Sequence, residues 1–271
     1  MLSCVTMRLM RHIRTCNNAV LPGGRVPLTV DGVGVGWMTP AVADLVGAAA
    51  ITAGALPALG VRLAAAGLFA WRDEPFDVRA TPDGPALGTI DRGALPALGM
   101  LAVGAHLNGL VHRSDGPWLW VARRAATKLL DPGKLDHIAA GGVAAGSTPW
   151  ETLLKEAEEE AEIPPALTAT ARAAGTIDYT MGRPEGLRRD RLHVYDLDLP
   201  ASFQPRPADG EVAGFELWPL PEILERLRVS EDFKFNVNLV LIDLVLRRRL
   251  VTGDEGRMLR TALPTTLTGC L

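Results

Sequence analysis

The residues best suited to chemistry form a twelve-residue run, 151–162, which holds six glutamates and a single basic residue. If the run is helical, Glu156, Glu159 and Glu160 are spaced i, i+3 and i+4 and project from one face. Carboxylates this close repel one another unless a hard cation lies between them. A glycine-rich turn, 140–146, comes directly before the run. The pattern suggests a site for a divalent metal ion and a phosphate ester.

The elements that must position this run follow from periodicity and turn residues. We predict the acidic helix over 149–161, because two prolines follow it at 164 and 165. Strands are predicted at 26–30, 33–38, 101–111, 118–122, 191–199 and 214–218. Further helices are predicted at 8–20, from Pro40 with Thr39 as N-cap, at 221–227 and at 236–249. Elements in this order favour a mixed sheet covered by helices.

Composition narrows the classes of function. The chain has 271 residues, 48% of them hydrophobic, and a net charge of −3, so it lacks the positive charge typical of nucleic-acid binding. Its three cysteines lie near the two ends and match no metal-ligand spacing, which favours a reducing cytoplasm. The uncharged, Ala- and Gly-rich run 45–61 is too short to span a membrane. The basic start lacks signal-peptide features, and a transit peptide is the less favoured alternative.

The segment 141–163 resembles the Nudix box, the signature of the Nudix hydrolases. The family pattern is G-x5-E-x7-R-E-U-x-E-E-x-G-U, where U is an aliphatic residue. The positions that match it are Gly141, Glu156, Glu159, Glu160 and Ile163. The resemblance implies that the three glutamates bind Mg²⁺, with Mn²⁺ as an alternative, together with a backbone carbonyl of the turn at Gly141. A solvated acidic helix face is the other interpretation of the glutamates, and the kept spacing favours the metal site.

Four positions depart from the box. Ser147 stands for the first glutamate, Lys155 for the arginine, Ala157 for a larger aliphatic residue and Glu162 for the late glycine. Lys155 can still neutralise a neighbouring carboxylate, although it lacks the planar fork of arginine. Ser147 could cap the helix instead. Glu162 loses the usual C-terminal glycine and adds negative charge at the negative helix end.

The rest of the chain resembles a narrower branch, the Nudix proteins related to the C-terminal part of some thiamine pyrophosphokinases, with an extra N-terminal domain. The strings that carry this resemblance lie at 104–109, 132–136, 185–190, 194–197, 209–212 and 233–236. The resemblance implies a Nudix α/β/α sandwich with a mixed sheet, plus a smaller N-terminal α+β domain. We place the N-terminal domain at 1–95, the Nudix domain at 96–250 and a tail at 251–271.

Other site residues follow from the same likeness. Glu211 lies where Nudix folds can carry a general base or an extra metal ligand, with a loop-surface carboxylate as the equal alternative. The predicted catalytic residues are Glu159, Glu160 and Glu211. The basic residues before the box are predicted to bind the diphosphate, with solvated surface an equal alternative for each: Arg123, Arg124 and Lys128. Asn108 and His106 share an alternating strand and could face the substrate, while a hydrogen-bonded core polar pair is the alternative.

Together these features predict a Mg²⁺-dependent pyrophosphohydrolase that acts on a small diphosphate. The branch resemblance implies damaged thiamine diphosphates, the oxo and oxy forms, as substrates that yield the monophosphate. Hydrolysis of a nucleotide sugar, ADP-ribose or a dinucleotide is the alternative within enzymes. A non-catalytic sensor that binds a diphosphate is the alternative outside them. No nucleic-acid or membrane partner is expected, and a homodimer is left open.

Overall fold

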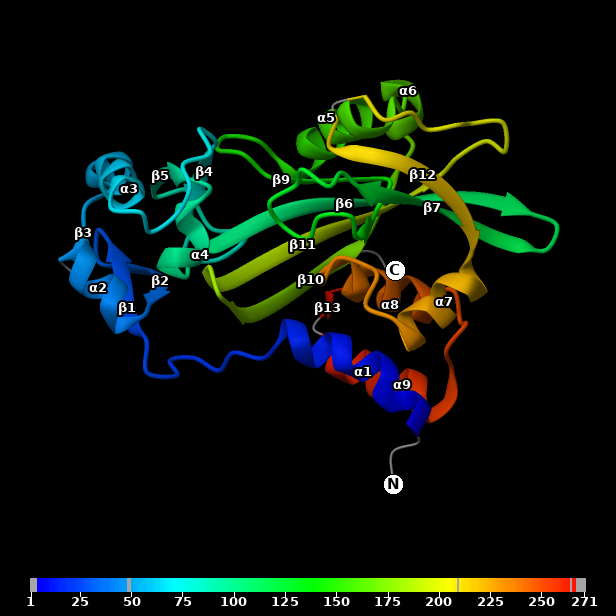
Figure 1. The fold of residues 1–271 in the computed structure, drawn as a ribbon, viewed down its shortest axis with the longest axis horizontal. Coiled ribbons are helices and arrows are strands. Elements are labelled where there is room, and N and C mark those ends of the chain that lie inside the picture. Colours follow the sequence, from blue (N-terminus) through cyan, green and yellow to red (C-terminus); the bar gives the residue numbers. More distant parts are fainter. Residues whose placement is uncertain (1–3, 48–49, 209, 264, 267–271) are drawn as a thin grey trace.

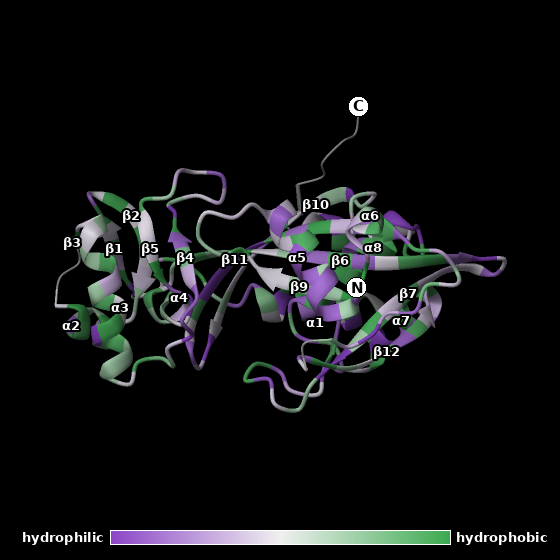
Figure 2. Ribbon diagram, turned by 90° about the horizontal axis from the view of Figure 1, so that it is seen from above, coloured by the Kyte–Doolittle hydropathy of each residue, from purple (hydrophilic) through white to green (hydrophobic). Residues whose placement is uncertain are grey.

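The structure is a computed structural model that describes residues 4–47, 50–208, 210–263 and 265–266. It contains a smaller N-terminal unit and a larger unit built around one long sheet (Figure 1). Seen from above, the N-terminal unit lies at one end of the molecule and the helices of the larger unit at the other (Figure 2). Within the described residues, no helix is both long enough and apolar enough to cross a membrane.

The N-terminal unit has its own apolar core, to which Leu28, Leu56, Phe76 and Leu98 belong. A hairpin of β1 (Val26–Val30) and β2 (Val33–Met38) confirms the predicted strand pair. The Thr39 hydroxyl accepts a hydrogen bond from Val42 N, so the predicted cap of α2 is confirmed. The unit's elements are α2 (Pro40–Val46), β3 (Ala50–Ile51), the 3₁₀ turn η1 (Ala53–Ala55), α3 (Leu56–Ala65), β4 (Pro75–Val78), β5 (Gly88–Asp91) and α4 (Ala94–Leu98).

The larger unit is built on a mixed sheet with the strand order β12-β7-β6-β11-β10-β13. Its central pair, β6 and β11, is parallel, whereas β6 pairs with β7 and β11 with β10 in antiparallel fashion. Two short strands, β8 and β9, pair with β7 and β6. The strands are β6 (Leu101–Arg113), β7 (Gly116–Arg124), β8 (Leu135–Asp136), β9 (Ala139–Gly142), β10 (Arg172–Arg183), β11 (Gly186–Asp198), β12 (Val212–Pro219) and β13 (Thr265–Thr266).

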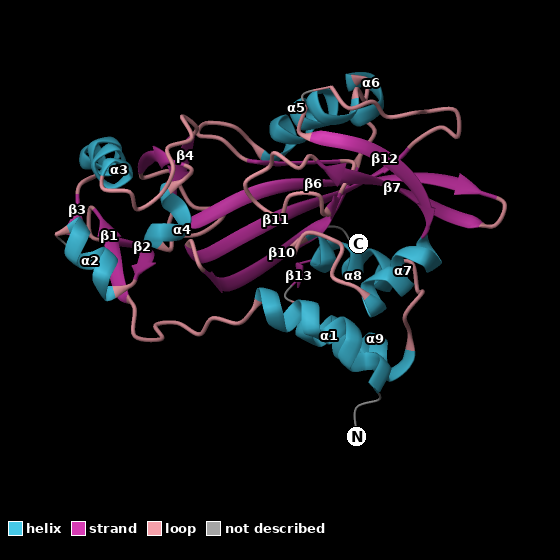
Figure 3. Ribbon diagram, in the orientation of Figure 1, coloured by secondary structure: helices cyan, strands magenta, loops and turns pink. Residues whose placement is uncertain are grey.

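Helices cover this sheet on both faces, as Figure 3 shows. On one face lie α5 (Pro149–Ala161) and α6 (Pro165–Thr168), where Leu153 and Ala157 pack against Leu107 and Leu197 of the sheet. The other face is covered by α7 (Leu220–Val229), α8 (Val237–Arg247), α9 (Gly253–Ala262) and α1 (Cys4–Cys16). The predicted α/β/α sandwich with a mixed sheet is therefore confirmed.

Two segments pack in ways that bear on the proposed domain division. Helix α1 lies on the larger unit, where the imidazole Nε2 of His12 is 2.8 Å from the Leu227 carbonyl oxygen. The segment predicted as a tail contains α9, whose Leu259 is fully buried in the same core. The boundaries near residues 95 and 250 stay predictions, but the first helix is packed with the second unit rather than the first.

Helix α5 spans the predicted residues because both of its ends are capped. Thr148 is the N-cap: its hydroxyl accepts from Glu151 N at 3.2 Å, and the Glu151 carboxylate accepts from Thr148 N at 2.9 Å. The predicted capping role of Ser147 is therefore wrong by one residue. At the other end Glu162 adopts the left-handed conformation, with φ 50° and ψ 36°. This is the conformation that the family's glycine takes at no steric cost.

We predict that Glu162→Gly stabilises the protein by about 0.5–1 kcal/mol. A left-handed L-residue costs about 1–2 kcal/mol, from which the larger loss of freedom of glycine on folding, about 0.5–1 kcal/mol, is subtracted. The ion pair of Glu162 with Arg206 spans 3.9 Å on the surface and contributes little. Urea unfolding measures the change. The matched exchange Glu158→Gly, at an exposed position inside α5, should have the opposite sign, and a loss of stability in Glu162→Gly would contradict the account.

Candidate active site

The glycine turn and α5 are in direct contact. Gly141 lies against Glu156 so closely that a Cβ at position 141 would be 2.3 Å from the Glu156 Cδ. Gly142 also lies close to the N-terminal unit, since a Cβ there would be 2.7 Å from Cζ of Phe76. A side chain at either position would therefore displace the Glu156 carboxylate or the Phe76 ring. The turn holds its place because β9 pairs with β6.

Two of the predicted metal ligands face this turn. The Glu156 side chain is only 19% exposed. Glu160 is buried, and one of its carboxylate oxygens accepts a hydrogen bond from Ala140 N at 2.8 Å. This bond fixes the carboxylate at the base of the glycine turn. The backbone of the turn and two carboxylates of α5 thus meet at one place.

Glu159 is placed differently from the other two carboxylates. Its side chain is half exposed and forms an ion pair of 3.1 Å with Lys155, one helical turn away. The Lys155 ammonium also lies 3.7 Å from Glu156. Lys155 therefore takes up the predicted role of charge balance. Exposed pairs of this kind contribute little to stability, so Glu159 can change partner at low cost.

Negative charge accumulates around Glu156. Burial raises the pKa of Glu156, and the charges of Glu159 and Glu211 raise it further. Lys155 and Arg92 act in the opposite direction without cancelling this effect. Burial is thus the main reason that the charged form of Glu156 is disfavoured.

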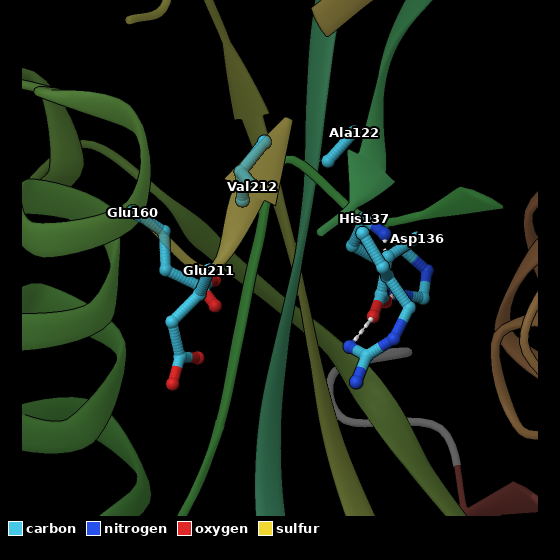
Figure 4. A pocket seen from close by; sticks show the side chains of 7 residues that line it. Ala122, Asp136, His137, Glu160, Glu211 and Val212 are labelled. Atoms are coloured by element: carbon cyan, nitrogen blue, oxygen red, sulfur yellow. Dashed lines mark hydrogen bonds and ion pairs between the residues drawn. The ribbon is translucent and has the colours of Figure 1, made fainter. Parts of the chain in front are cut away.

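A small pocket brings Glu160 and Glu211 together. Figure 4 shows both carboxylates on the side of α5, and Asp136 and His137 across the opening. Glu211 forms an ion pair with Lys128. Its carbonyl also accepts from Ala125 N at 2.8 Å, which ties the loop after β7 to the start of β12. The lining residues are Ala122, Arg124, Asp136, His137, Glu160, Glu211 and Val212.

The two arginines predicted to bind substrate differ in their exposure and in their hydrogen-bond partners. Arg124 is largely buried, and its guanidinium donates to Asp136 at 2.7 Å and to the Leu130 carbonyl at 2.8 Å. It therefore holds the loop that follows β7. Arg123 is about half exposed and contacts the Gly133 carbonyl at 3.3 Å and Glu216 at 3.4 Å. Of the two, Arg123 has the guanidinium that is more accessible to an anion.

Asn108 and His106 lie on the α8 side of the sheet, away from α5. Asn108 is fully buried and donates to Asp196 at 2.9 Å. The Nδ1 atoms of His106 and His137 are 3.0 Å apart, and burial lowers the pKa of both rings, that of His137 to about 4. Both residues therefore match the alternative interpretation, in which they are hydrogen-bonded polar residues of the core. The substrate role of Asn108 stays a prediction, and solvent does not reach it in this structure.

The donor set can be tested against a divalent cation. Within the described ranges, which omit 1–3, 48–49, 209, 264 and 267–271, no three His, Cys, Asp or Glu side chains lie close enough to form a complete metal cluster. Mg²⁺ usually binds through one or two carboxylates and completes its shell with water and substrate phosphates. The carboxylates of Glu156 and Glu160 at the turn fit a cation held in that way.

Residues of the N-terminal unit also reach the turn, and sequence reasoning missed them. Phe76 packs on Gly142, and Arg92 is close enough to lower the pKa of Glu156. Arg92 pairs with Glu74 at 2.7 Å and lies over the Phe76 ring. No local signal in the sequence marks these residues, because only the packing of the two units brings them to the site.

The comparisons with known proteins agree with this geometry. Residues 104–238 match the NUDIX domain. Nudix hydrolase 24, chloroplastic, of Arabidopsis thaliana is 38% identical over 184 residues, and Nudix hydrolase 20, chloroplastic, of the same plant is 35% identical over 185. Each alignment covers 68% of this chain and 50% of the relative. This chain therefore spans about half the length of these curated relatives.

Two further similarities were found. Uncharacterized protein YJR142W of Saccharomyces cerevisiae is 33% identical over 203 residues, which cover 70% of this chain and 58% of the yeast protein. Among solved structures, DR0079 from Deinococcus radiodurans is 22% identical with a TM-score of 0.49, over 62% of this chain and 97% of that one. With its glycine turn and glutamate helix inside the matched region, this chain carries a NUDIX domain at residues 104–238.

Proposed function

We propose that this protein is a Nudix pyrophosphohydrolase that depends on a divalent cation and cleaves a diphosphate-linked small molecule. The observation that carries the proposal is the meeting of Glu156, Glu160 and the glycine turn at one point. Glu211 lines the same pocket as Glu160 and acts electrostatically on Glu156. This arrangement supplies oxygen ligands and negative charge where a Mg²⁺ or Mn²⁺ diphosphate complex needs them.

Each residue has a separate proposed role. The bound cation would polarise the diphosphate and lower the pKa of a water molecule. Glu156 and Glu160 hold the cation, with Glu160 oriented by Ala140 N–H, and Glu159 joins them once it leaves Lys155. Glu211, 47% exposed and paired with Lys128, accepts the proton of the attacking water. Lys128 and Arg123 bind the phosphate oxygens.

For the substrate, we propose the oxo and oxy forms of thiamine diphosphate as the first compounds to test, on the branch resemblance. ADP-ribose, nucleotide sugars and dinucleotides are the second set, since the Nudix family as a whole acts on diphosphates of this kind. Binding without turnover is the third outcome. We also propose a cytoplasmic setting with no nucleic-acid or membrane partner, and a sizing column decides between monomer and homodimer.

We predict that Glu159→Gln and Glu160→Gln each lower kcat for Mg²⁺-dependent hydrolysis by roughly 10²- to 10⁴-fold, because each removes a carboxylate that the reaction uses. Phosphate or monophosphate release across the diphosphate panel measures the loss. The matched exchange Glu158→Gln changes an exposed glutamate of the same helix and should keep activity near that of the wild type. Full turnover in both active-site variants would place the reaction elsewhere.

A second prediction concerns Glu156 and pH. Because the folded-state pKa of Glu156 is raised, its ionised form destabilises the metal-free protein at neutral pH. This penalty is absent below the ordinary glutamate pKa of about 4.3 and is complete above the raised pKa. Metal-free Glu156→Gln should therefore be at least as stable as the wild type at pH 7, with the difference lost near pH 4.

Mg²⁺ binding should show the complementary effect. Added Mg²⁺ should raise the melting temperature of the wild type but much less that of Glu156→Gln. The Mg²⁺ effect on the wild type should weaken as pH falls through the raised pKa, because proton and cation compete for one carboxylate. Thermal unfolding at several pH values, with and without Mg²⁺, measures both. An equal Mg²⁺ effect in the variant would exclude Glu156 as a ligand.

A further inference from the structure

A groove lies between the N-terminal unit and the Nudix unit, on the α5 side of the sheet. Its volume is about 190 Å³. Phe76, Asp77 and Arg79 come from the N-terminal unit, and Ser147 belongs to the turn before α5. His193 of β11 lies on the sheet side. The groove is therefore built by both units and borders the glycine turn.

The groove has a fixed shape because several bonds join its walls. Ala145 N donates to the Pro75 carbonyl at 2.9 Å, and Gly146 N donates to Asp77 at 3.4 Å. Arg191 of β11 bridges Asp178 of β10 and Asp83 of the N-terminal unit, with a nitrogen–oxygen distance of 2.7 Å to each. These contacts tie strand β4 to the turn and the loop after β4 to the sheet. A ligand would thus meet a preformed site.

The chemistry of the groove favours a neutral ring over a phosphate or an alkyl chain. Apolar side chains form much of its wall: Phe76, Pro82, Leu101, Val103, Val143 and Pro149. Arg79 is already paired with Asp77 at 2.7 Å, so it offers little free positive charge to an anion. Among the residues that the structure describes, the Ser147 hydroxyl and the His193 ring have no hydrogen-bond partner. Burial lowers the pKa of His193, which keeps the imidazole neutral at pH 7.

The groove also explains why residue 147 departs from the family pattern. The Nudix box has a glutamate at this position, and here the position lines the groove. A glutamate would fill part of the space and place a second carboxylate near Asp77. Serine leaves room and adds one neutral donor and acceptor. The substitution therefore creates space where the two units meet.

We propose that this groove binds the uncharged heteroaromatic ring of the diphosphate substrate, with Ser147 and His193 bonding the polar edge of the ring. The inference rests on the proposed function and deepens it by giving the N-terminal unit a part in substrate recognition. The volume suits one ring, since a cavity of about 150 Å³ can hold benzene. Pro149 at the groove and Glu156 at the metal site are seven residues apart, or about 10 Å along the helix. A substrate spans this distance when a small ring separates its uncharged heteroaromatic ring from the diphosphate, as the thiazolium does in oxythiamine diphosphate and the ribose in ADP-ribose.

The test replaces Ser147 by glutamate, the residue that the Nudix box has at this position. Ser147→Glu should raise KM for oxythiamine diphosphate or ADP-ribose by about tenfold, with kcat little changed, because it blocks the ring but leaves the carboxylates of α5 in place. Pro82→Trp should do the same from the opposite wall. Isopentenyl diphosphate, which has no ring, should keep its KM within about twofold in both variants. Ala144→Glu is the matched control, as it adds the same charge to an exposed position of the same turn outside the groove.

A KM increase of the same size for ring-bearing and ring-free diphosphates in Ser147→Glu would overturn the inference, as would an equal effect in Ala144→Glu. A second measurement does not depend on turnover. Calorimetry with oxythiamine and with adenosine should show binding to the wild type and to Ala144→Glu, and its loss in Ser147→Glu. If no diphosphate is hydrolysed but this binding pattern appears, the proposed hydrolysis fails and the ring site stands. If hydrolysis occurs without the pattern, only the ring site fails.

Discussion

The site depends on one packing contact, the close approach of Gly141 to Glu156 and of Gly142 to Phe76. Glu156 fills the position that a side chain at 141 would need, and Phe76 fills the one at 142. The turn is thus held between α5 and the N-terminal unit while β9 pairs it to the sheet. A methyl group at position 141 would displace the Glu156 carboxylate, and one at position 142 would displace the Phe76 ring. The carboxylates, the sheet and the N-terminal unit are positioned by one short stretch of backbone.

On the α8 side of the sheet, buried charged residues fix the positions of neighbouring elements. Asp136 is almost fully enclosed; burial alone would raise its pKa, but Lys234, His137 and Arg124 lower it well below its usual range. Asp196 accepts from Arg247 of α8 at 2.6 Å and from Asn108 of β6. These pairs are costly to bury and costly to break, so they fix how α8 lies on the sheet. The pocket wall formed by Arg124 and Asp136 is part of this network.

Local rules explain what the sequence could predict. Helix 149–161 was predictable because its caps and flanking prolines lie within a few residues, and the hairpin at 26–38 because a two-residue turn sets its register.

Strand β10 was missed because its alternating polar residues find partners only across the sheet, as Asp178 does in Arg191. For Arg124 the sequence could not tell the buried role from the surface one, because its partners, Leu130 and Asp136, become neighbours only when the loop closes. Periodicity indicates that a strand has two faces, but it does not indicate which face a helix will cover. The sequence therefore could not decide whether Asn108 faces the substrate or lies in the core.

The geometry of the carboxylates is not a property of the Nudix unit alone. The chain begins with α1 on the larger unit, forms the N-terminal unit, and then returns through β6 to build the sheet. On that path it places Pro75 against Ala145, Phe76 against Gly142, and Arg92 within electrostatic reach of Glu156. A Nudix unit without these contacts would lose the Pro75 and Phe76 contacts that hold the outer side of the turn. The positive charge of Arg92, which lowers the pKa of Glu156, would be lost as well, so the N-terminal unit contributes to both the packing and the electrostatics of the site.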